Sequence, residues 1–156
     1  MKLTPTKHLH ALPEKLRHDW ADALMNGGYE QGRSRLASEP QGPAKWCCLG
    51  VLAHEVLGVE QALCSGLGLL SALDSAYGIP APAGMTGRAW NRIQERLDRV
   101  EMVYDEDDRG YTFPALNDTA GLSFAAIARL LRGEALDVER AETRDEDGTR
   151  PIVVIN

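Results

Sequence analysis

The chain has 156 residues, of which 44% are hydrophobic and 26% are charged, as in ordinary globular proteins. Its formal net charge is -6, and the charge is unevenly placed: residues 1–50 carry seven basic and five acidic side chains, and the remainder carries 10 and 18. Because affinity for DNA depends on neutralising phosphates, this balance argues against direct DNA binding and places any anion site in the N-terminal third.

The length predicts a single globular domain over residues 1–156, with residues 1–11 and 140–150 as flexible segments. Three cysteines, two of them adjacent, do not make a disulfide framework. No run approaches the ~20 apolar residues of a membrane span. We therefore expect a protein of a reducing, cytoplasmic compartment that does not contact a membrane.

The first helix is predicted from Pro13 to a stop at Gly27. Within it Leu16, Trp20 and Leu24 recur at every fourth position, which gives one apolar stripe facing the core.

A second helix is predicted from residue 45 or 46 to residue 57, where eight consecutive residues carry no charge. A helix that is apolar nearly all round must be enclosed by other elements, so we expect it at the centre of the fold. Gly50 in its interior costs about 1 kcal/mol relative to alanine, which predicts close approach of a neighbouring element at that point.

Further elements follow in the second half of the chain. A short helix is expected around residues 69–76, and an amphipathic helix from about 86 to 100. The outer face of the latter carries six charged residues: Arg88, Arg92, Glu95, Arg96, Asp98 and Arg99. Residues 102–104 and 111–113 predict a β-hairpin, Ser123 caps a last helix that ends at Gly133, and residues 151–155 resemble a final strand.

Together these elements predict a mainly α fold of the α+β type. About four helices pack around the central apolar helix, and one small antiparallel β-hairpin completes the fold.

The segment that begins at residue 29, between the first two predicted helices, is the main candidate for a binding site, and we call it the arm. Two planar guanidinium groups suit carboxylate or phosphate, and neighbouring residues can stack or hydrogen-bond. The predicted ligand-binding residues are Tyr29, Gln31, Arg33, Arg35 and Lys45. The alternative is that both arginines pair with carboxylates elsewhere in this acidic chain.

Cys47, Cys48 and Asp118 are secondary candidates for catalysis. A helix N-terminus lowers a thiol pKa, but His54 lies about 10 Å along the same helix from Cys47 and cannot act as its base. Core packing is the favoured role of both cysteines. Asp118, with the preceding asparagine, is expected to form a turn before the last helix.

The acidic run Asp105, Glu106, Asp107 and Asp108 is the candidate partner-binding surface, by mimicry of nucleic-acid charge. It lacks the bidentate glutamate of a calcium loop, and no zinc spacing is present, so we expect neither a metal nor a cofactor. Residues 121–139 resemble the start of a helix-turn-helix, but the segment that should read DNA is acidic.

Several of these segments occur together: Trp20, then Tyr29-x-Gln31-Gly32, then Cys47-Cys48-Leu49-Gly50-Val51-Leu52, then Leu116-Asn117-Asp118 and Ser123-Phe124-x-x-Ile127-Ala128. In this order they resemble a family of small phage and prophage proteins without assigned activity. The resemblance covers roughly residues 14–58 and 114–132.

The resemblance implies an accessory protein in the cytoplasm of a bacterial host, with a role in host interference such as counter-defence. We expect a binding protein rather than an enzyme, which either sequesters an anionic small molecule such as a nucleotide or blocks a host protein. The alternatives are a cysteine- or aspartate-dependent hydrolase and a structural or assembly protein. The sequence does not indicate an oligomeric state.

Overall fold

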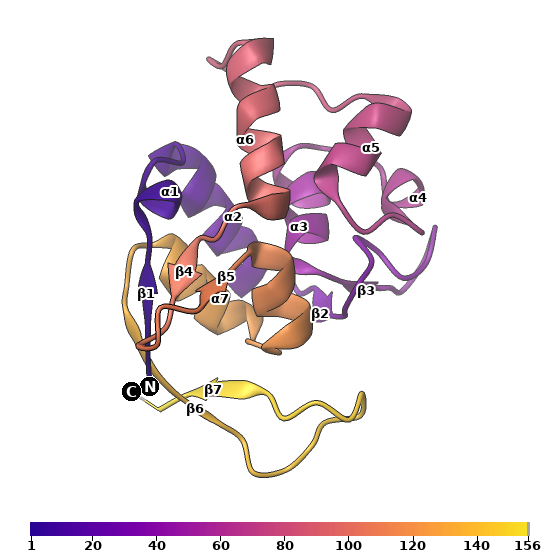
Figure 1. Ribbon diagram of the computed structural model, residues 1–156. Helices are drawn as coiled ribbons and strands as arrows, with labels where there is room; N and C mark the ends of the chain where they lie inside the picture. Colours follow the sequence, from indigo (N-terminus) through magenta and orange to yellow (C-terminus); the bar gives the residue numbers. More distant parts are fainter. Residues whose placement is uncertain (156) are drawn as a thin grey trace.

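The structure, a computed structural model, describes residues 1–155. Within these residues five strands form an antiparallel sheet with the order β5-β4-β1-β6-β7. The strands are β1 (Lys2–Pro5), β4 (Val103–Tyr104), β5 (Gly110–Tyr111), β6 (Leu136–Arg140) and β7 (Ile152–Val154). The first and last described residues lie side by side at one end of the molecule (Figure 1).

The N-terminal segment is the middle strand of this sheet. Leu3 of β1 is fully buried and pairs with Leu136 of β6, and on the other side Thr4 pairs with Tyr104 of β4. Thr6 ends the strand and caps the next helix, because its hydroxyl accepts hydrogen bonds from the following backbone N–H groups. Most of residues 1–11, which the sequence predicts to be flexible, thus lie in a strand and a helical turn.

The helices lie on one side of the sheet and extend beyond it (Figure 1). The longer ones are α2 (Glu14–Asn26), α5 (Leu70–Tyr77), α6 (Gly87–Arg99) and α7 (Phe124–Leu131). Single-turn segments are α1 (Lys7–His10), α3 (Cys48–Val51) and α4 (Gln61–Cys64), and two π-helical turns are η1 (Leu52–Val56) and η2 (Ala115–Thr119). The segments α4, α5 and α6 gather at the end of the molecule opposite the β6–β7 hairpin (Figure 1).

The prediction of a mainly α fold with about four helices and one hairpin is wrong. The predicted hairpin is present as β4 and β5, but it is one edge of the five-stranded sheet. The predicted central helix is a short α3 that continues as η1, and helical structure is divided among more and shorter segments. Strands of two to five residues are too short to show a period, and their partners lie far away in sequence.

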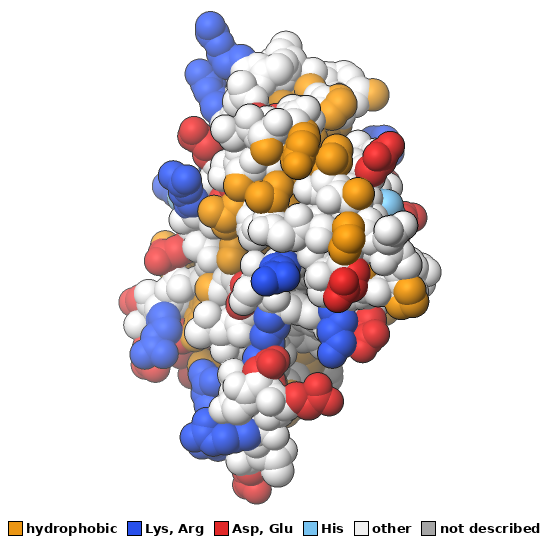
Figure 2. Space-filling view, turned by 90° about the vertical axis from the view of Figure 1, so that its right-hand side faces the viewer, with side chains coloured by type: hydrophobic (Ala, Val, Ile, Leu, Met, Phe, Trp, Pro, Cys, Tyr) orange, Lys and Arg blue, Asp and Glu red, His pale blue; other side chains and the backbone are white. Residues whose placement is uncertain are grey.

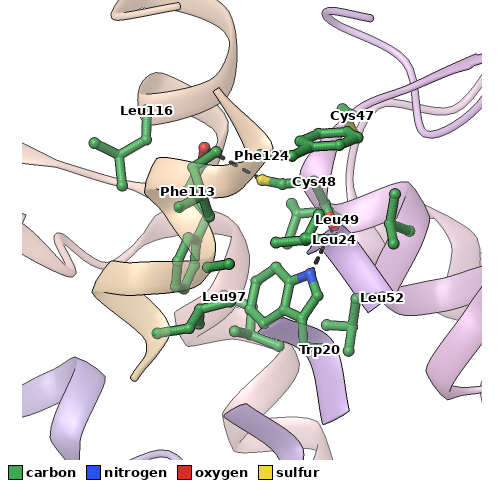
Figure 3. Close-up of a cluster of buried hydrophobic side chains, with 14 of the residues drawn as sticks. Trp20, Leu24, Cys47, Cys48, Leu49, Leu52, Leu97, Phe113, Leu116 and Phe124 are labelled. Atoms are coloured by element: carbon green, nitrogen blue, oxygen red, sulfur yellow. Dashed lines mark hydrogen bonds between the residues drawn. The ribbon is translucent and has the colours of Figure 1, made fainter. Parts of the chain in front are cut away.

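One part of the hydrophobic core lies where α2 meets α3. The indole of Trp20 lies 4.6 Å from the ring of Phe113, centre to centre, and its Nε1 donates a 2.9 Å hydrogen bond to the carbonyl of Cys48 (Figure 3). A Cβ on Gly50 would stand 1.8 Å from the carbonyl oxygen of Leu36, so the close approach predicted at Gly50 is confirmed. The arm that follows α2 is thereby pressed against α3.

Two short strands lie at the two ends of that arm. They are β2 (Glu30–Gln31) and β3 (Lys45–Trp46), which pair in parallel.

In residues 1–155 no helix has the length and apolar character needed to cross a bilayer.

Candidate functional site

Asn117 is a buried polar residue at the junction of the arm, α3 and α7. Its side-chain oxygen accepts hydrogen bonds from the backbone N–H of Cys48, at 3.2 Å, and from Nε2 of Gln31, at 3.0 Å. Its amide nitrogen donates to the carbonyl of Gly32, at 2.8 Å, and to Oδ1 of Asp118, at 2.7 Å. The side chain is fully buried and its hydrogen-bonding capacity is used.

Gln31 and Asp118 extend this network on either side, and we call the three residues the Asn117 clasp. Gln31 also donates to the carbonyl of Leu122 and accepts from the backbone N–H of Phe124, so it caps the start of α7. Asp118 accepts from the backbone N–H of Ser34, a residue held at a positive φ of 68°. That hydrogen bond offsets the strain of about 1–2 kcal/mol that a non-glycine residue meets there.

A polar groove of about 370 Å³ lies against the clasp. Its walls come from the arm, η2 and the loop between β6 and β7. The lining residues are Gln31, Gly32, Arg33, Lys45, Asn117, Gly121, Asp145, Glu146 and Asp147. Three of the five predicted ligand-binding residues therefore line one hollow, together with three carboxylates that the sequence did not place there.

Arg33 is paired within the protein. Its guanidinium group forms a short ion pair with Asp145 and a second ion pair with Asp147, at 3.3 Å. Burial opposes ionisation of Asp145, but hydrogen bonds from the backbone N–H of Thr149 and from Arg33 outweigh it and lower the pKa of that carboxyl. Gly121, at a φ of +65°, leaves room for this guanidinium, because a Cβ there would lie 2.9 Å from its Nη2. Arg33 thus fastens the β6–β7 loop over the groove.

Arg35 and Tyr29 do not line the groove. The Arg35 side chain is exposed and has no hydrogen-bond or ion-pair partner among the described residues. Tyr29 turns to the other side of the arm, where it packs edge-on against Trp46, at 5.4 Å between ring centres, and donates a short hydrogen bond to Glu55. Burial and that hydrogen bond raise the pKa of Tyr29.

Lys45 lies at the rim of the groove. It is exposed, and its Nζ is 3.9 Å from Oε1 of Glu30. This weak surface pair leaves the ammonium group available to a ligand.

The cysteines have surroundings that disfavour nucleophilic chemistry. Cys47 is 5% exposed, and burial raises its pKa to about 12. Cys48 is fully buried, and burial raises its pKa as well. Its Sγ faces the carbonyl of Phe113 at 3.7 Å (Figure 3). A thiol with a raised pKa carries little thiolate at neutral pH.

Asp105 has a structural role in the acidic run. It is 8% exposed, and its carboxylate accepts hydrogen bonds from the backbone N–H groups of Asp107 and Arg109 and from the hydroxyl of Tyr111. Burial opposes its ionisation, yet these hydrogen bonds lower its pKa. The exposed part of the run consists of Glu106, Asp107 and Asp108. In residues 1–155 no group of three or more His, Cys, Asp or Glu side chains is placed to hold a metal ion.

No family model matches the chain, and no solved structure matches it. Curated proteins do. One from Mycobacterium tuberculosis (strain ATCC 25618 / H37Rv), named "Putative S-adenosyl-L-methionine-dependent methyltransferase", is 32% identical over 93 residues, which are 60% of this chain and 27% of that protein. A protein of the same name from Mycobacterium avium (strain 104) is 30% identical over 109 residues, covering 69% of this chain and 33% of the relative. A third, from Mycolicibacterium paratuberculosis, is 26% identical over 116 residues, with coverages of 73% and 33%.

The chain thus spans between 27% and 33% of the length of these relatives. Their names conflict with the predicted phage-type accessory binding protein and its counter-defence role, and with the expectation that the protein is not an enzyme. The alternatives, a cysteine- or aspartate-dependent hydrolase and an assembly protein, are not methyltransferases either. On this comparison those predictions are wrong.

Proposed function

We propose that this chain takes part in S-adenosylmethionine-dependent methyl transfer, and that the polar groove receives the methyl acceptor. The observation that carries the proposal is the identity of about 30% over 93–109 residues with proteins named for that reaction. Since the chain spans at most a third of the length of those relatives, the proposal assigns it one side of the reaction, either binding of the cofactor or binding of the methyl acceptor.

The fold indicates which side. Open α/β folds bind nucleotide cofactors in a crevice at the carboxyl ends of parallel strands. The five-stranded sheet is antiparallel throughout, and the only parallel strand pair in the described residues, β2 with β3, is two residues long. The described residues therefore do not form the kind of crevice that would hold S-adenosylmethionine, and no step is assigned to the cofactor. The role left for this chain is binding of the methyl acceptor.

The groove suits a polar acceptor. Its volume of about 370 Å³ is in the range of small-molecule sites. The Asn117 clasp forms a rigid wall whose hydrogen bonds are already made, while Lys45 and Glu146 at the rim offer a donor and an acceptor. Fixed walls with a few charged groups at the rim favour a ligand that both donates and accepts hydrogen bonds.

The proposal is tested by competition. Tritium transfer from methyl-labelled S-adenosylmethionine to a cell extract is measured with the full-length M. tuberculosis relative, alone and with a 100-fold excess of this chain. If both proteins hold the same class of acceptor, the excess chain lowers the transfer. The variant Arg33→Gln should compete less well, and Arg35→Gln, which changes an exposed arginine outside the groove, should compete like the unaltered chain. Transfer that is unaffected by the excess contradicts the proposal.

A further inference from the structure

The outer face of α6 carries four exposed arginines. They are Arg88, Arg92, Arg96 and Arg99, which we call the arginine face. At 100° per residue all four fall within an arc of about 80° around the helix axis. All are exposed, and none has a hydrogen-bond or ion-pair partner among the described residues.

Two carboxylates near this face, Asp98 and Asp74, are used elsewhere. Asp98 points inward, is 4% exposed and accepts hydrogen bonds from the backbone N–H groups of Leu70 and Ser71, where it caps the start of α5. Asp74 of α5 accepts from the backbone N–H of Ile79. Glu95 shares the face but forms no ion pair with any described residue, so the face keeps an excess of three positive charges.

The opposite face of α6 packs against the core of the protein. Its inner face buries Trp90 and Leu97, and the hydroxyl of Thr86 caps its first turn through the backbone N–H of Ala89. In Figure 1 α6 stands at the end of the molecule away from the β6–β7 hairpin, and at the same height in Figure 2 Lys and Arg side chains stand out at the edge of the surface. Three of the four arginines also line a shallow hollow of about 390 Å³ beside Val100.

The spacing of the charges favours a regular polyanion. With a rise of 1.5 Å per residue, successive arginines are about 6, 6 and 4.5 Å apart along the helix axis and span about 16 Å in total. A nucleic-acid strand offers a phosphate about every 3.4 Å of its axis, so the row of arginines spans about five such intervals, and guanidinium groups bind phosphate through two parallel hydrogen bonds. A membrane surface is a poorer match, because the arc contains no apolar side chain to enter it.

We propose that the arginine face of α6 binds the phosphodiester backbone of a nucleic acid. The net charge of -6 does not forbid this, because charges more than a Debye length away, about 10 Å at 0.1 M salt, are largely screened. The expectation of no direct DNA binding was drawn from the whole-chain charge and from residues 121–139, and α6 lies outside that segment. The inference does not depend on the methyl-transfer proposal.

The test is fluorescence anisotropy with labelled 20-base-pair DNA and RNA duplexes and the corresponding single strands, at salt concentrations from 50 to 200 mM. Four phosphate contacts should lower the affinity on the order of 100-fold over that range. The double variant Arg92→Gln/Arg96→Gln should bind more weakly and lose about half of the salt dependence. Glutamine is a good helix former, and a circular-dichroism melting curve verifies that the variant is folded.

The matched control is Arg140→Gln/Arg150→Gln, which removes the same charge from the β6–β7 hairpin, and it should bind within about twofold of the unaltered chain. DNA and RNA arms identify which backbone is bound. The proposal is overturned if no nucleic acid binds at 50 mM salt, if both double variants weaken binding equally, or if only vesicles containing phosphatidylserine are bound.

Discussion

Arg33 and the arginine face of α6 present the same guanidinium chemistry in opposite surroundings. Arg33 is partly buried and pairs with two carboxylates of the β6–β7 loop, while the α6 arginines are exposed and without partners in the described residues. An arginine that is neutralised from within contributes to the fold, and a row that is not remains available to something outside. The sequence alone does not distinguish these two kinds of arginine. It favours Arg33 as the ligand-binding residue, because Arg33 lies close to the uncharged segment of residues 46–53.

The largest effect should come from Asn117→Ala, which removes the centre of the clasp to which Arg33's arm is attached. Four hydrogen bonds are lost, and the buried N–H of Cys48 is left without its partner. We expect a loss of about 3 kcal/mol in the free energy of unfolding, measured in urea. Asn91→Ala, at an exposed site on α6, is the control and should change it by less than about 0.5 kcal/mol. A loss below about 1 kcal/mol for Asn117→Ala would mean that the clasp does not hold the arm.

Gly50→Ala should follow, because the added Cβ would meet the carbonyl of Leu36 at 1.8 Å and push the arm away from α3. We expect a loss of about 2 kcal/mol, detected as a lower melting temperature. The control Gly87→Ala adds a Cβ that meets nothing within 4 Å, at the first residue of α6. Unchanged stability of Gly50→Ala would show that the arm moves freely over α3.

Arg33→Gln should have a smaller effect that depends on pH. The Asp145 pKa is lowered in the folded protein, so the stability that its ion pair contributes is present above the unfolded value of 3.8 and is lost as the pH falls through the lowered folded value. Urea midpoints of the variant and the unaltered chain should therefore differ at pH 7 and approach each other near pH 3. A difference that is constant over this range would assign the effect to packing rather than to charge. Arg35→Gln serves as the control and should leave the midpoint unchanged at both pH values.

Arg92→Gln should have the smallest effect of all. Since this guanidinium has no partner in the described residues, its removal relieves repulsion among neighbouring arginines and should change the free energy of unfolding by less than about 0.5 kcal/mol. Chemical denaturation at low salt measures this. A loss above 1 kcal/mol would reveal a partner within the protein and would remove the contrast with Arg33.

The sequence predicted local features better than long-range ones. The helix from Pro13 to Gly27 is present as α2, because a proline at its start, a glycine at its end and an apolar stripe are all local features of this segment. The strand β1 was missed, since four residues show no period and its partners begin about 100 and 130 residues later.

The candidate site shows the same limit. The pair Asn117-Asp118 was interpreted as a local turn, but its hydrogen bonds reach Gly32 and Ser34, about 85 residues away. Whether Arg33 is free or paired depends on Asp145 and Asp147, which lie more than 110 residues further along the chain. Residue types indicated which groups were able to pair, and only the fold decides which of them do.

The place of β1 in the sheet also has a consequence for biosynthesis. This strand precedes both of its neighbours in the chain, yet it is flanked by β4 and β6, so its two edges wait for segments that are made about 100 and 130 residues later. Pairings between such distant segments form slowly, and unpaired strand edges invite aggregation in the meantime. The nascent chain therefore completes the pairing of β1 only after synthesis of β6, which makes the interval between synthesis of β1 and of β6 the period in which a chaperone would matter most.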